Sequence, residues 1–110
     1  MSEADPLLEQ VQEALRHLGL AEHRTADGWF YKDEGNIAAQ VGRRRGAVSV
    51  YAKLPQAAAR AALASGEVQP HPLPRLAATG WVCLLVISGE QIPRAVELVR
   101  TSAATLRSKR

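Results

Sequence analysis

The sequence predicts one α+β domain over residues 1–110, in which helices pack on one face of a mainly antiparallel sheet. Three observations predict this class. A chain of 110 residues is long enough for one core. Apolar residues recur with helical spacing in some segments and alternate with polar ones in others. Short turn sequences connect the alternating segments, so the expected element order is α-β-β-β-α-β-α.

The first helix is expected over the stretch DPLLEQVQEALRHLG. Asp5 suits the N-cap, Pro6 suits the first turn, and Gly19 suits the left-handed closing position. The apolar residues of this stretch recur at helical spacing and give it one face for a core: Leu7, Leu8, Val11, Ala14, Leu15 and Leu18.

Three antiparallel strands are expected next, after a polar connection. A short aromatic strand, residues 29–32, leads through the turn residues 33–36 into a second strand at residues 37–41. A second turn, at residues 43–46, leads into a strand in which Val48, Val50 and Ala52 share one face. The alternation predicts a sheet with one buried face.

The second half of the chain predicts two more helices around a central strand. An alanine-rich helix begins at Pro55 and ends near Gly66, and a proline-bearing loop with a short strand at residues 67–69 follows. The stretch GWVCLLVIS is apolar on both faces and is expected at the sheet centre. Ser88 and Gln91 have the spacing of a capping box before the last helix. The expected core is Leu8, Val11, Leu15, Val48, Val50, Trp81, Val82, Leu84, Val86, Val96 and Val99.

Charge divides the chain into two unequal halves. Residues 1–41 hold eight acids and three bases, whereas residues 42–110 hold eleven bases and three acids, for a net charge of +3. Such a division favours an anionic partner, most plausibly nucleic acid, or contact between protein chains, including a homodimer. Six basic residues of the second half are the expected nucleic-acid contacts: Arg43, Arg44, Arg45, Arg100, Arg107 and Lys109. The alternative for the three arginines is a solvated turn, and for the helical ones compensation of the helix dipole.

An alternative function uses a different surface. His71, between two prolines, together with Tyr51 and Trp29, is the expected ligand-binding set of a module that binds a small ligand or a protein through the open sheet face. The aromatic run Trp29 to Tyr31 also fits ordinary packing, and an exposed loop position is the alternative for His71.

Several function classes lack their usual sequence features. There is no P-loop, no GxGxxG and no GxSxG, and the three histidines and one cysteine do not have the spacing of a metal site. Cys83 lies in an apolar strand, where we expect an inert thiol. We therefore predict no catalytic residues, metal or cofactor, and a binding domain rather than an enzyme. An acidic N-terminus and the lack of a long apolar segment predict a cytoplasmic chain without a membrane partner.

The second half, roughly residues 37–105, resembles two related families of small proteins. Leu54 and Pro55, Pro70, Trp81 and Val82, Ile92 and Pro93, and Ser102 stand in the order found in YjbR (MmcQ-like) proteins. With Gly66, His71 and Gly80 added, the same positions are similar to proteins labelled as luciferase-like domains. The resemblance implies a compact α+β fold that has been compared with DNA-binding proteins. The histidine expected from the luciferase-like pattern is absent from the strand at residues 37–41.

Overall fold

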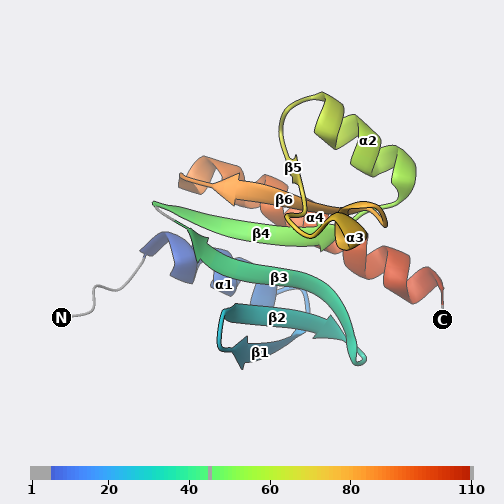
Figure 1. Ribbon diagram of the computed structural model, residues 1–110. Helices are drawn as coiled ribbons and strands as arrows, with labels where there is room; N and C mark the ends of the chain where they lie inside the picture. Colours follow the sequence, from blue (N-terminus) through green and yellow to red (C-terminus); the bar gives the residue numbers. More distant parts are fainter. Residues whose placement is uncertain (1–5, 45, 110) are drawn as a thin grey trace.

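A computed structural model describes residues 6–44 and 46–109 of the chain, with the side chain of Arg44 outside the description. Figure 1 shows the arrangement of its helices and strands. In chain order these are α1 (Pro6–Arg16), β1 (Ala21–Thr25), β2 (Gly28–Asp33), β3 (Asn36–Arg44), β4 (Ala47–Lys53), α2 (Gln56–Ala64), β5 (Gln69–Pro70), α3 (Pro74–Ala77), β6 (Trp81–Val86), the 3-10 turn η1 (Gly89–Gln91) and α4 (Ile92–Ser108).

The six strands form one sheet in the order β1-β2-β3-β4-β6-β5, and every pairing between neighbours is antiparallel. Helices α1 and α4 lie behind the sheet in Figure 1, while α2 lies at the end of the sheet near β6. The α+β class and the mainly antiparallel sheet are therefore confirmed. To the predicted elements the structure adds β1 and α3, and it places the short strand at residues 69–70.

Strand β1 was missing from the expected elements, because its sequence AEHRT gives no apolar alternation. It forms the edge of the sheet and pairs only with β2, from Ala21 opposite Lys32 to Thr25 opposite Gly28. None of its five residues is fully buried. An edge strand with this exposure needs no apolar face, and polar side chains protect such an edge from further pairing.

The core lies between the sheet and the two covering helices. Nine of the eleven expected core residues are buried; the two exceptions, Trp81 and Val96, are half-buried. Trp81 was expected at the centre of the core, but it begins β6 opposite Lys53 and its ring lies near His71 instead. Cys83 is buried, as expected for an inert thiol.

A serine from α4 hydrogen-bonds to the backbone at a bulge in β3. The register between β2 and β3 shifts between Tyr31 and Lys32, so that Ala38 has no opposite residue. The Ser102 hydroxyl donates to the Ala38 carbonyl at 2.7 Å and accepts from the Lys53 backbone N–H at 3.3 Å. Ser102 is buried, and its hydroxyl therefore satisfies two backbone groups that the bulge would leave unpaired.

Residues 54–80 form an insertion between two paired strands, and we call this segment the insertion. Strands β4 and β6 are neighbours in the sheet, although α2, β5 and α3 lie between them in the chain. The two ends of the insertion meet where the Leu54 N–H donates to the Gly80 carbonyl at 2.9 Å. Buried Ala59, Ala62 and Val68 join the insertion to the common core.

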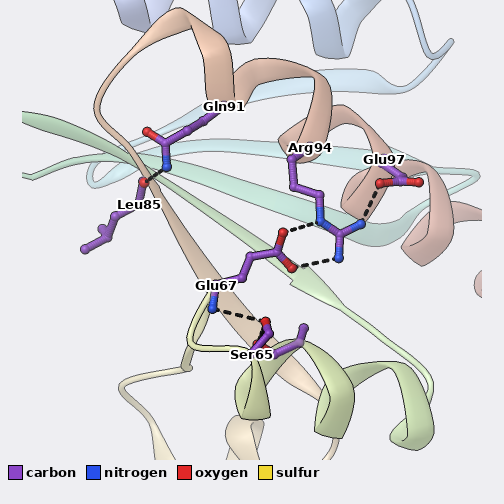
Figure 2. Close-up of polar contacts among 7 residues, drawn as sticks. Ser65, Glu67, Leu85, Gln91, Arg94 and Glu97 are labelled. Atoms are coloured by element: carbon purple, nitrogen blue, oxygen red, sulfur yellow. Dashed lines mark hydrogen bonds and ion pairs between the residues drawn. The ribbon is translucent and has the colours of Figure 1, made fainter.

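A polar cluster fastens the insertion to α4 (Figure 2). Arg94 contacts both carboxylate oxygens of Glu67, at 2.6 and 2.8 Å, and its third nitrogen contacts Glu97 at 2.6 Å. The Glu67 N–H donates to the Ser65 hydroxyl, and the Gln91 amide donates to the Leu85 carbonyl. The bonds of Gln91 and Ser88 complete the predicted capping box at the start of η1.

Replacing Glu67 with glutamine is expected to lower the free energy of unfolding at neutral pH by up to about 1 kcal/mol, the usual limit for a partly exposed pair. The hydrogen bond from Arg94 holds the pKa of Glu67 below its ordinary value. The stabilisation is therefore present above the pKa of the unfolded chain and is lost as the pH falls through the lower pKa of the folded state. Urea unfolding at pH 7 and at acid pH measures this difference.

The matched control is Glu97→Gln, which removes only a single contact of Arg94 at a more exposed carboxylate. We expect a smaller change from it at neutral pH. Equal losses for the two variants, or a Glu67→Gln difference that stays constant into acid, would show that the paired contact does not fasten the insertion.

Among residues 6–44 and 46–109, no helix has both the length and the apolar character that a membrane-spanning segment requires.

Candidate functional site

The face of the sheet opposite α1 and α4, here called the open face, carries one row of side chains that crosses all six strands. Residues directly opposite each other on neighbouring strands point to the same face. The row is His23, Phe30, Gln40, Tyr51, Cys83 and Gln69. The next positions along the strands, such as Val41, Val50 and Leu84, point to the covered face and are buried.

A pocket of about 340 Å³ opens over this row. This volume lies at the lower end of the range for small-molecule sites. Its wall comes from the β1–β2 turn, the middle strands and the insertion: Thr25, Asp27, Gly28, Trp29, Phe30, Gln40, Val41, Gly42, Arg43, Ser49, Tyr51 and His71. Two residues expected to bind a ligand, Tyr51 and His71, are thus brought together although 20 positions separate them in the chain.

The insertion fixes His71 above the sheet. Its backbone N–H donates to the Trp81 carbonyl at 3.2 Å, and its ring nitrogen Nδ1 accepts from the Leu73 N–H at 3.0 Å. The ring centroid lies 4.8 Å from that of Tyr51 and 6.2 Å from that of Trp81, edge-on to the latter. These contacts place an imidazole against two aromatic rings at the side of the pocket.

His71 is a hydrogen-bond donor in its neutral form. Burial lowers the pKa of its imidazole below the ordinary value, so the ring is neutral at pH 7. Because Nδ1 accepts a hydrogen bond, the ring proton lies on Nε2. Within the described part of the chain, no residue hydrogen-bonds this nitrogen or the Tyr51 hydroxyl. Both groups are therefore available to a ligand.

The aromatic run Trp29 to Tyr31 is divided between the two faces of the sheet. Tyr31 is fully buried on the covered face, where its hydroxyl donates to the Glu22 carboxylate and burial raises its pKa. Trp29 shares that face and packs against the core, with the Arg24 guanidinium 4.9 Å above its ring. Trp29 therefore borders the pocket, and it is Phe30 that contributes a ring to the open face.

Those of the six expected nucleic-acid contacts whose side chains the structure describes do not gather on one surface. Arg43 lies beside the β3–β4 turn, while the Arg44 side chain and Arg45 are outside the described residues. Arg107 contacts Asp33 at 3.0 Å, beside the β2–β3 turn at the other end of β3. Figure 1 shows the start of β4 and the last turn of α4, which carries Lys109 at its end, at opposite ends of the molecule.

Other candidate groups are dispersed over the surface. His17 and His23 are exposed, and no group of three or more histidine, cysteine or acidic side chains among the described residues has the arrangement of a metal site.

A larger hollow of about 890 Å³ lies between α1 and the start of α4. No aromatic ring lines it, and its Arg16 is paired with Glu13 on the same helix. The open-face pocket, which aromatic residues line, is therefore the stronger candidate for a ligand site.

Comparisons of this chain with protein families, with curated proteins and with solved structures find no significant match. The resemblance to YjbR-like and luciferase-like proteins stays a prediction.

Proposed function

We propose that this protein is a non-enzymatic binding domain that takes a small flat ligand in the open-face pocket. The observation that carries the proposal is the meeting of Tyr51 and His71, from a central strand and from the insertion, above a pocket of about 340 Å³. Stacked or edge-on rings favour flat, unsaturated ligands, because ring contacts add to the apolar area that binding buries.

The polar groups of the pocket support a binding role rather than catalysis. The Ser49 hydroxyl, a nucleophile in other settings, donates to the Gly42 carbonyl at 3.2 Å and is buried. A neutral His71 with a proton on Nε2, the Tyr51 hydroxyl and the Gln40 amide supply hydrogen bonds to a ligand that lies on the rings. Such a combination of rings with a few polar groups is typical of small-molecule sites.

The proposal is tested by two-dimensional amide NMR with indole and adenosine as flat probes and cyclohexanol as a saturated control. We expect the flat probes to move the resonances of Phe30, Gln40, Tyr51 and His71, and to leave those of α4 in place. Shifts spread evenly over the protein, or equal shifts with cyclohexanol, would contradict a site for flat ligands.

A pair of histidine variants tests the contribution of the insertion. His71→Ala removes a ring from the pocket wall and is expected to weaken indole binding roughly 2- to 10-fold, the range of one aromatic contact. His17→Ala makes the same change at an exposed position of the α1 C-terminus and should leave binding unchanged. Equal weakening by both variants would contradict the proposed pocket.

A further inference from the structure

An aromatic residue followed two positions later by a lysine occurs on two strands of the open face. Phe30 and Lys32 lie on β2, and Tyr51 and Lys53 lie on β4. Both strands are antiparallel to β3, which lies between them, so they run in the same direction. Side chains two residues apart on a strand share a face, and both pairs therefore have the same orientation on the open face.

The register fixes the spacing of these pairs. Phe30 and Tyr51 lie opposite the same residue, Gln40, and are therefore two strand spacings apart, about 10 Å. Each lysine follows its aromatic residue by about 7 Å along the strand. The result is a row of two rings with an amide between them and, further along the strands, two partly exposed lysines.

The acidic group of the pocket lies at the opposite end from the lysines. Asp27 lines the pocket from the β1–β2 turn, just before β2 begins, whereas Lys32 lies near the end of that strand. An anion on the open face is therefore favoured at the lysine end and disfavoured at the Asp27 end. The charges give the bound molecule a direction: its flat parts on the rings and its anionic parts toward Lys32 and Lys53.

We propose that the open face binds single-stranded nucleic acid, with bases stacked on Phe30 and on Tyr51 and phosphates beside Lys32 and Lys53. The inference rests on the proposed function and names the class of its flat ligand. Two stacking rings with two cations at one spacing match a polymer that repeats a base and a phosphate. The Gln40 amide between the rings can donate to and accept from the edge of a base.

The arrangement favours a single strand over a duplex. Inside a duplex the faces of the bases are covered by their neighbours, and rings on a sheet face have nothing to stack on. This binding surface differs from the one that the charge distribution suggests. Its cations are Lys32 and Lys53 on the sheet, beside the aromatic rings, rather than the arginines at residues 43–45 and the basic end of α4.

Fluorescence anisotropy with end-labelled ten-residue oligo-dT and oligo-U, at about 50 and 200 mM salt, tests the inference on the full chain. We expect saturable binding that weakens as salt rises, since each neutralised phosphate of a single strand adds about 0.7 to the salt slope. An unlabelled duplex of the same length should compete poorly.

Two variants separate the stacking from the charge. Tyr51→Leu keeps an apolar side chain but removes the ring, and it should weaken binding roughly tenfold with the salt slope unchanged. The double variant Lys32→Ala with Lys53→Ala should reduce the salt slope by about 1.4. The matched control, Arg100→Ala with Lys109→Ala, removes two charges from α4 on the other side of the sheet and should change neither quantity. Thermal unfolding of each variant verifies that it is folded.

The outcomes distinguish this inference from the function on which it rests. If indole and adenosine move the open-face resonances but neither oligonucleotide binds at 50 mM salt, the nucleic-acid inference fails and the flat-ligand pocket stands. If neither kind of probe binds, both fail. Binding that the α4 control weakens as much as the open-face variants would overturn the inference in favour of general charge attraction, and preferential binding of the duplex would overturn it as well.

Discussion

Replacing Leu84 with alanine is expected to lower the free energy of unfolding by about 2–5 kcal/mol, the range for truncating a leucine in a packed core. Leu84 lies in the middle of β6, opposite Val50, and is 3% exposed. The change removes apolar contacts and leaves a cavity between the sheet and α4, which the neighbouring strands cannot readily fill. Urea unfolding should show the loss, and the melting temperature should fall by about 10 °C or more.

The matched control is Leu63→Ala on α2, the same truncation at a side chain that is 37% exposed. It should cost less than about 1 kcal/mol, because a partly exposed leucine loses less buried area and leaves no cavity. Comparable losses for the two leucines would mean that β6 is not the centre of the core.

Replacing Gly80 with alanine is expected to lower the free energy of unfolding by about 2 kcal/mol or more. Gly80 has a φ of +103°, a conformation that strains a residue with a side chain, and a Cβ atom there would lie 2.4 Å from the Leu54 carbonyl oxygen. Relief of that clash requires the two ends of the insertion to separate, which breaks the bond from the Leu54 N–H to the Gly80 carbonyl. Chemical denaturation measures the loss.

Gly66→Ala is the matched control because it also places alanine at a positive φ, +78°, within the insertion, but with no atom within 4 Å of the new Cβ. It should carry the conformational strain alone, about 1 kcal/mol. The difference between the variants measures the contact between the insertion ends. In NMR spectra, Gly80→Ala should also move the His71 resonances; an unmoved His71 would contradict a coupling between these ends and the pocket.

Local sequence patterns were sufficient to predict α1, α2, α4 and the central strands. Alternation identified the buried face of β4, and the unbroken apolar run identified β6 as a strand with neighbours on both sides. The sequence predicts the capping box of Ser88 and Gln91, which the structure confirms, because both partners lie within one turn. These features depend on neighbours in the chain, which is the information that a sequence pattern carries.

Local patterns do not predict which segments pack together when they are far apart in the chain. The polar strand β1 depends on its partner β2 rather than on an apolar face of its own. The half-burial of Trp81 depends on how the insertion places His71 beside it. A large apolar residue in a strand is predicted to be buried from its type alone, because the sequence does not show which elements cover that strand.

The candidate site was predictable in part. Tyr51 and His71 were expected to bind a ligand, and the structure places both on one pocket, whereas Trp29 is mainly a core residue. Lys32 and Lys53 are not among the expected contacts, although their shared spacing from Phe30 and Tyr51 is visible in the sequence. The spacing alone does not show that the two pairs lie near each other. The strand order does, because β2 and β4 are both neighbours of β3.

The sheet and the insertion between β4 and β6 contribute different parts of the pocket. The strands form a platform whose shape is set by the core beneath it, while the insertion, whose two ends are joined by a hydrogen bond, contributes His71 to the pocket. Changes in the length or sequence of that segment can reshape the pocket while the pairing of β4 with β6 is retained. Under the proposed function, the binding preference can thus change through one segment, as in other folds that keep a scaffold and vary its connections.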